Sequence, residues 1–69
     1  MNAQNQEPSD RFSESGRQWV WCRVWKCWQH DNYKFKIYPQ PDGFTCSYDS
    51  VWLDGMFKSF EDAEKELFN

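Results

Sequence analysis

Three cysteines and one histidine are the residues of this chain that could bind a metal ion or act as a nucleophile and base. Cys22, Cys27, His30 and Cys46 follow one another with spacings of four, two and fifteen residues. Three thiols and an imidazole would suit zinc, but structural zinc sites usually begin with two cysteines on a tight turn. Cys22 and Cys27 instead fall an odd number of positions apart on one expected strand, which puts them on opposite faces. We therefore expect no metal, and we expect the cysteines to be buried and free.

Nucleophilic catalysis would require a cysteine with His30 in reach and an acid to orient the imidazole. Cys27 and His30 flank one expected turn, but a surface hairpin offers no pocket around them. The acidic residues near the C-terminus, Glu61, Asp62, Glu64 and Glu66, are typical of the solvated face of a helix. The sequence thus predicts a protein that is not an enzyme and needs no cofactor.

The composition limits the class of protein further. The chain has 69 residues, enough for one small domain. Its mean hydropathy is −1.01, no apolar run approaches the length of a membrane span, and no apolar stretch follows a charged start. Because an odd number of cysteines cannot complete a disulfide framework, a reducing compartment is the simpler interpretation. We expect a cytoplasmic protein that does not bind membranes.

The net charge of −3 is distributed unevenly along the chain. Residues 1–18 carry −1, residues 19–58 carry +1 and residues 59–69 carry −3. An acidic total argues against a generic nucleic-acid binder.

The first 17 residues differ in composition from the rest. Met1, Ala3 and Phe12 are their only apolar side chains, too few to offset the entropy of ordering the segment. We interpret residues 1–17 as a flexible polar tail and residues 18–69 as the single folded domain. The alternative is a segment that orders on a partner, with Phe12 as its anchor.

Strand-forming residues then follow in three runs. Residues 19–28 are almost entirely β-branched, aromatic or Cys, residues 33–38 alternate apolar and polar, and residues 44–53 form a third strand with a possible break at Asp49-Ser50. Turn residues separate the runs, and Asp54-Gly55 favours a short fourth strand at Met56-Phe57. A helix follows, capped by Ser59, with an apolar stripe at Phe60, Ala63, Leu67 and Phe68.

These elements predict an α+β fold, a three- to four-stranded antiparallel meander sheet with one C-terminal helix packed on one face. The expected core comprises Val20, Cys22, Val24, Phe35, Ile37 and Phe44 or Cys46 from the sheet, with Phe60, Ala63 and Leu67 from the helix.

The other face of the sheet carries the functional signal. Both faces of the first expected strand are apolar. Its expected outer face holds Trp19, Trp21, Arg23, Trp25 and Cys27, and the next strand adds Lys34, Lys36 and Tyr38 to the same face. Trp, Tyr and Arg are enriched in interface hot spots, and an uncovered apolar patch usually marks an interaction site. Three interpretations stay open: a second small core covered by the tail or the Trp52 region, a protein-binding face, or a nucleic-acid-binding face.

Residues 51–67, VWLDGMFKSFEDAEKEL, resemble the last strand and helix start of the plant ethylene-response-factor type of DNA-binding domain and of the related arm-binding domain of integrases. The resemblance implies a three-strand-plus-helix fold whose sheet enters the DNA major groove through Arg and Trp. It covers about a quarter of the chain. Here Arg23 and a few lysines stand where that family presents several arginines.

The leading hypothesis is a small intracellular protein-binding module, an inhibitor or adaptor that docks on a larger protein. Its sharpest form is a phage-type anti-defence inhibitor whose acidic helix occupies the basic groove of a nucleic-acid-binding host protein. The alternative is a DNA-binding accessory domain that uses the Trp, Arg and Lys sheet face. A homodimer through the Trp face is a third possibility, because an uncovered aromatic sheet can be self-complementary about a two-fold axis.

Overall fold

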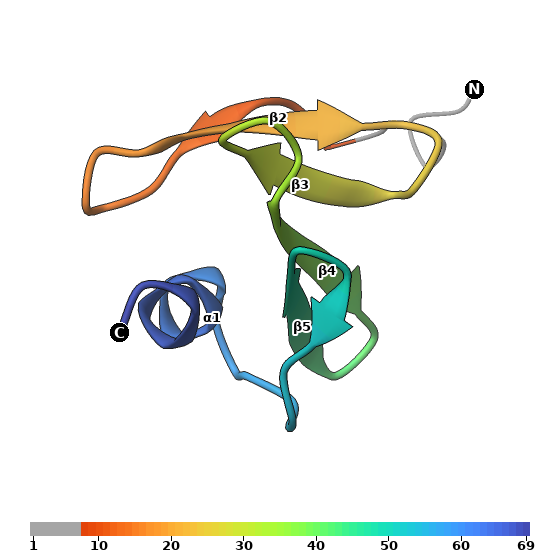
Figure 1. Cartoon of the computed structure of the whole chain (residues 1–69), viewed down its shortest axis with the longest axis vertical. Helices are drawn as coiled ribbons and strands as arrows, with labels where there is room; N and C mark the ends of the chain where they lie inside the picture. The colour runs from red at the N-terminus through yellow and green to blue at the C-terminus, as the bar shows by residue number, and fades with distance from the viewer. Residues whose placement is uncertain (1–7) are drawn as a thin grey trace.

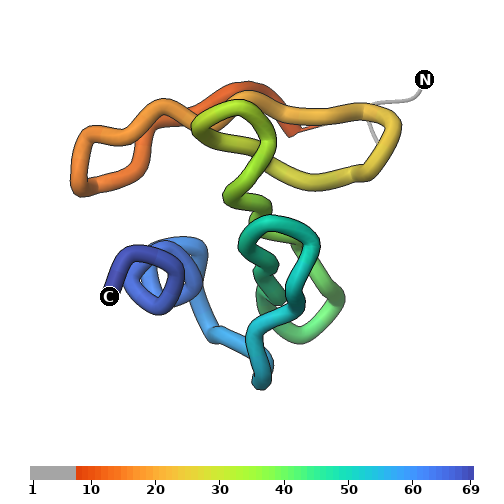
Figure 2. The backbone as a smooth tube through the Cα atoms, viewed as in Figure 1, coloured from red at the N-terminus to blue at the C-terminus, as the bar shows by residue number. Residues whose placement is uncertain are grey.

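The computed structural model describes residues 8–69 and contains one antiparallel sheet and one helix. The strands are β1 (Arg11–Phe12), β2 (Gln18–Cys22), β3 (Cys27–His30), β4 (Phe35–Gln40), β5 (Gly43–Tyr48) and β6 (Val51–Trp52), and the helix is α1 (Phe60–Leu67). Each strand pairs with its sequence neighbours, and the twisted sheet bends around α1 (Figures 1 and 2). The predicted α+β meander with a C-terminal helix is confirmed, with six strands in place of three or four.

One additional strand arises because residues 19–28 form a hairpin and not a single strand. The turn is residues 23–26, closed by a 2.8 Å hydrogen bond from Lys26 N to Cys22 O. Lys26 adopts a φ of 57°, a left-handed conformation that usually belongs to Gly or Asn. The sequence Arg-Val-Trp-Lys carries no such turn residue, so its strand-forming composition concealed the reversal.

In this hairpin, the face of β2 that packs against α1 is the one that the sequence predicted to face outward. Trp19 is fully buried against α1, whereas Val20 is 46% exposed and Val24, in the turn, is 81% exposed. The placement of Val20, Cys22 and Val24 in the core, and of Trp19 and Trp21 on the outer face, was therefore wrong, since Trp21 also packs against the core. Both faces of this strand are apolar. The face with the larger side chains is buried, because its burial removes more apolar area from water.

The other expected core positions are confirmed. Ile37, Cys46, Phe60 and Ala63 are buried, together with Trp19 and Trp28. Packed around them are the half-buried side chains of Trp21, Phe35, Phe44, Leu53, Phe57, Leu67 and Phe68. Phe60 is central to this core, since its ring makes edge-to-face contacts with Trp19 at 5.4 Å and Trp28 at 5.1 Å between ring centroids.

The expectation of an unstructured tail is wrong for residues 8–17, and residues 1–7 lie outside the described residues. Arg11 pairs with Trp19 in the β1–β2 ladder, and Ser13 N donates to Arg17 O at 2.9 Å to close the next turn. The guanidinium of Arg11 lies 4.0 Å from the centroid of the Phe60 ring. This segment is held by polar and cation–π contacts, which a count of apolar side chains does not register.

The third expected strand is divided by a turn at Asp49-Ser50, where φ is 51° and 70°. Residues Val51–Trp52 therefore form β6 and pair back onto β5. The short strand expected at Met56-Phe57 is only an isolated bridge, in which Phe57 exchanges two backbone hydrogen bonds with Phe44, of 2.7 and 2.8 Å. The helix begins as predicted, because the Ser59 hydroxyl accepts a 3.0 Å bond from Asp62 N.

Glu64 is the one buried acidic residue among residues 8–69, with 3% of its surface exposed. Its carboxylate accepts hydrogen bonds from Trp19 Nε1 at 2.9 Å and Ser15 Oγ at 3.0 Å, and the Arg17 guanidinium lies 3.5 Å away. Burial is the largest single influence on the pKa of Glu64 and raises it. Hydrogen bonding by Ser13, Trp19 and Ser15, together with the charge of Arg17, outweighs burial, so the pKa lies below its ordinary value of 4.5.

The substitution Glu64→Gln should therefore destabilise the protein by about 2 kcal/mol at neutral pH, because it replaces charge-assisted hydrogen bonds to a buried carboxylate. The native pKa is depressed, so the ionised carboxylate stabilises the fold fully above pH 4.5 and progressively less as the pH falls through the lower native pKa. Urea unfolding at neutral and acidic pH measures both effects.

The matched control is Glu66→Gln, an exposed residue of the same helix, which should change the unfolding free energy by only about 0.5 kcal/mol or less. Equal unfolding free energies for the two variants at neutral pH would contradict the assigned role of Glu64.

Candidate functional site

The register of the sheet defines two rows of side chains across adjacent strands. One row, Trp21, Trp28, Ile37 and Cys46, faces α1. The neighbouring row, Val20, Gln29, Lys36, Ser47 and Trp52, faces away from it. We call this second side the back face, to which Cys22, Cys27 and Tyr38 also belong by strand alternation.

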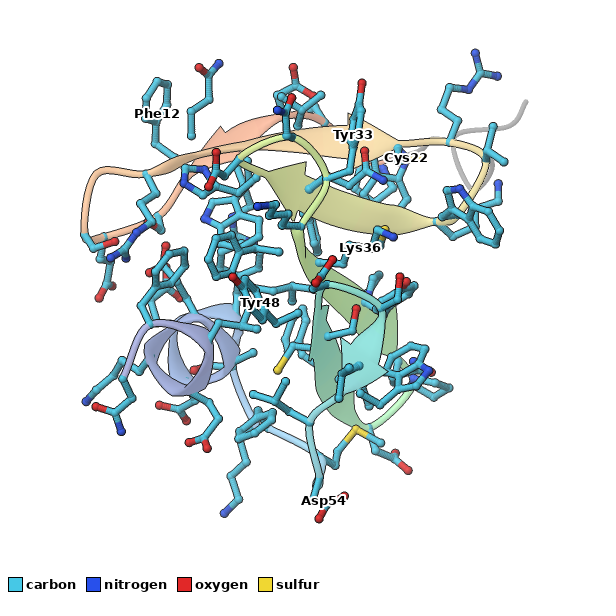
Figure 3. All side chains as sticks on the ribbon, viewed as in Figure 1. Phe12, Cys22, Tyr33, Lys36, Tyr48 and Asp54 are labelled. Carbon is cyan, nitrogen blue, oxygen red and sulfur yellow. The ribbon has the colours of Figure 1, made fainter. Side chains whose placement is uncertain are left out.

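A shallow groove of ≈ 580 Å³ lies beside the N-terminal segment, but a second groove, of ≈ 470 Å³, opens on the back face and is more apolar. The second groove is lined by Val20, Trp21, Cys22, Val24, Trp25, Gln29, Tyr33 and Lys36. Figure 3 shows three of these, Cys22, Tyr33 and Lys36, on the side of the sheet away from α1. Trp25 is 63% exposed and Tyr33 66% exposed, so the groove presents aromatic surface to solvent.

Two turns position these aromatic side chains. Trp25 lies in the β2–β3 turn, where its backbone N donates to Cys22 Sγ at 3.4 Å. Tyr33 is the third residue of the β3–β4 turn, after two other residues of positive φ, Asp31 at 56° and Asn32 at 58°, and its own φ is 68°. A bulky residue in this conformation is strained, and such strain is concentrated at functional sites. The turn holds Tyr33 against the groove at a conformational cost.

One cation lines this groove. Lys36 is half-buried there, while Arg23, which lines the groove beside the N-terminal segment, and Lys34 are exposed on the two turns. Two exposed aspartates lie beside Lys34: Asp31 in the same turn, and Asp49, whose backbone N donates to Lys34 O at 2.8 Å. The groove therefore combines an apolar lining with one cation, Lys36.

The far end of the back face is partly covered. The rings of Tyr38 and Trp52 are 4.7 Å apart between centroids, so β6 folds Trp52 onto Tyr38. Burial, and next the neighbouring Cys27, raise the pKa of Tyr38. The hypothesis of a covered second core thus describes this end, where Tyr38 is half-buried, but not the groove around Trp25.

The predicted site residues are consequently separated into two groups. Arg23, Trp25, Lys34, Lys36 and Tyr38 lie on the back face or its turns. Trp19 is buried, and Trp21 lies at the groove edge with its ring packed edge-to-face on Trp28, 5.0 Å between centroids. Sequence reasoning missed Val24, Tyr33 and Trp52, because their exposure depends on turns at residues 23–26, 31–34 and 49–50, and it missed Val20 because the wrong face of β2 was assigned to the core.

The acidic helix offers a different surface. Asp62 and Glu66 are exposed, and Glu61 lies 3.8 Å from the Arg11 guanidinium. Glu64 belongs to the interior and cannot contribute to this surface.

Cys22 and Cys27 lie directly opposite each other across β2 and β3, so the expectation that they occupy opposite faces was wrong. All three cysteines are free thiols. Burial raises the pKa of the Cys27 thiol to about 11, with Cys22 as the next cause, and the pKa of Cys46 to about 11 through burial and then Glu66. Within residues 8–69, no cluster of three His, Cys, Asp or Glu side chains could hold a metal ion.

No family model matches this chain, and no curated protein or solved structure matches it either. The resemblance of residues 51–67 to the ethylene-response-factor type of domain stays a prediction. Among the described residues, no helix is long and apolar enough to cross a membrane.

The placement of the tryptophans leads to a stability prediction. Replacing Trp25 with Ser should change the unfolding free energy by about 0.5 kcal/mol or less, because its side chain is mostly in water. Replacing Trp28 with Ser should cost about 3–5 kcal/mol, because it leaves a large cavity beside Phe60. Thermal melts followed by circular dichroism distinguish the two variants, and a large loss for Trp25→Ser would place Trp25 in the core.

Proposed function

We propose that this protein is a small, non-enzymatic protein-binding module, an inhibitor or adaptor that docks on a larger protein through the groove around Trp25. The observation that carries the proposal is the exposed aromatic and aliphatic surface of Val24, Trp25 and Tyr33 beside a groove of ≈ 470 Å³. A chain of this size has a strong energetic reason to bury such side chains, so their exposure on strained turns favours recognition.

The chemistry of the groove indicates the chemistry of the partner. Val20 and Val24 beside Trp25 favour an aliphatic or aromatic side chain as the inserted group. Lys36, which also lines the groove, favours a carboxylate beside that group. We infer a partner surface with an apolar anchor next to an acidic residue.

The runner-up function is nucleic-acid binding, and one observation favours it: exposed Trp25 and Tyr33 line one groove with Lys36, and the turns that carry them also hold Arg23 and Lys34. Stacking of bases on aromatic rings beside cations is the usual way to bind single strands. A major-groove reader built from Trp19 and Trp21 is less well supported, because Trp19 is buried and Trp21 packs on Trp28.

Binding experiments with single-tryptophan variants test the proposal. In a pull-down from the native host, the wild-type chain should retain a partner that Trp25→Ser loses, with affinity reduced about 30-fold or more, as expected for a hot spot of about 2 kcal/mol. Trp52→Ser is the matched control, since Trp52 is 57% exposed on the same face but lies outside the groove. It should bind as the wild type does.

Two further results would contradict the proposal in identifiable ways. Binding to a single-stranded oligonucleotide at low salt, with affinity falling steeply as salt is raised and lost in Trp25→Ser, would establish the runner-up function. If Glu66→Gln lost the partner and Trp25→Ser retained it, the docking surface would be the acidic helix and not the groove.

A further inference from the structure

Cys22 and Cys27 form a pair that neither the core nor the proposed partner binding uses. They are direct partners in the β2–β3 ladder, at the two ends of the turn that carries Trp25. Cys22 is half-buried and lines the groove, whereas Cys27 is fully buried. Two thiols opposed in this way face the same side of the sheet.

The hydrogen bonds of β2 define the type of this pair. Trp21 N donates to Asp10 Oδ1 at 2.8 Å, so the polar groups of Trp21 point towards β1 and those of Cys22 point towards β3. Cys22 O accordingly accepts from Lys26 N. Opposed residues of this hydrogen-bonded type have Cα atoms about 5.5 Å apart, which lies within the range of about 4.4–6.8 Å that disulfides span.

We propose that Cys22 and Cys27 are a reversible dithiol–disulfide site, which exchanges with small disulfide compounds such as glutathione disulfide. The bond is labile for a geometric reason. Opposed Cβ atoms lie about 4.5–5.5 Å apart in an antiparallel pair, whereas a disulfide needs about 3.5–4.5 Å. Closing the bond draws the strands together, and the resulting strain makes it more easily reduced.

The exchange proceeds in two balanced steps. The Cys22 thiolate attacks one sulfur of the small disulfide, which forms a mixed disulfide on Cys22 and releases one small thiolate. The Cys27 thiol then loses its proton and attacks Cys22 Sγ, which forms the Cys22–Cys27 bond and releases the second small thiolate. Two electrons and two protons leave the protein, and two small thiols are formed.

The surroundings favour this order. Cys22 is the more accessible thiol, and its sulfur accepts a hydrogen bond from Trp25 N. Cys27 reacts second because burial keeps its pKa high until Cys22 has become a neutral mixed disulfide. Cys22 then no longer raises the pKa of Cys27, while Lys36 and Tyr38 lower it. Cys46 takes no part, because it belongs to the row that faces α1.

The sequence provides a direct assay. Arg23 and Lys26 lie between the two cysteines, so trypsin separates residues 18–23 from residues 27–34 unless a disulfide joins them. The folded full chain is incubated with glutathione disulfide, its free thiols are alkylated, and the tryptic peptides are identified by mass. We expect these two peptides to be joined with Cys46 alkylated, and excess reduced glutathione to restore all three thiols.

Variants assign the chemistry to the pair. Cys46→Ser should form the same bond, and Cys22→Ser should form none. Cys27→Ser should stop at a glutathione adduct on Cys22, which identifies the attacking thiol. Because the wild-type peptide map is decisive by itself, poor folding of one variant does not prevent the test.

Three results would overturn the proposal. They are a wild-type chain that stops at the Cys22 adduct, a bond that involves Cys46, and a Cys22–Cys27 bond that forms only in denaturant. None of them bears on partner binding by Trp25, so the site and the proposed function fail or succeed separately.

Discussion

The hydrogen bond between the Trp19 indole and the buried Glu64 carboxylate links the two ends of the molecule. Trp19 anchors β2, Glu64 lies on α1, and the 2.9 Å bond joins residues that are 45 positions apart. A buried carboxylate is costly unless it is fully paired. Ser15 and Arg17 complete its pairing, and both belong to the turn between β1 and β2. The polar N-terminal segment is therefore part of the fold, because without it Glu64 would lose these two partners.

This constraint also determines which face of β2 is turned inward. Trp19 can reach Glu64 only from the side of the sheet that faces α1, and Trp21 and Trp28 follow it by alternation and register. Val20 and Cys22 must then face the other way. Apolar residues on the back face are thus a consequence of burying the larger aromatic side chains, and the groove forms where the β2–β3 turn adds Val24 and Trp25.

The sequence was sufficient to predict the class of the fold and much of the core, for reasons that are local. Alternation at residues 33–38, the Ser59 cap and the stripe through Phe60, Ala63 and Leu67 are short-range patterns. The hairpin at residues 23–26 could not be predicted, because it has no Gly, Pro or Asn and its left-handed residue is Lys26. The role of Glu64 was equally hidden, since an acidic residue on a short helix usually faces solvent and only tertiary contacts distinguish it from Glu61 and Glu66.

The candidate site could be predicted where it depends on residue type, but not where it depends on which face of a strand a residue occupies. Trp25 and Lys36, both expected on one surface, line the same groove, whereas Trp19, expected with them, is buried and Tyr33 was not expected there. A tryptophan can belong to the core or to a recognition surface, and the amino-acid composition does not distinguish the two roles. The indole N–H helps to distinguish them here: Trp19 donates to Glu64, and Trp28 donates to Ser9 O at 3.0 Å. A large buried ring needs such a partner, whereas the Trp25 ring, 63% exposed on a turn, can meet its polar requirement with water or with a bound protein. The same physical rule that fixes two tryptophans in the interior therefore leaves a third available for binding.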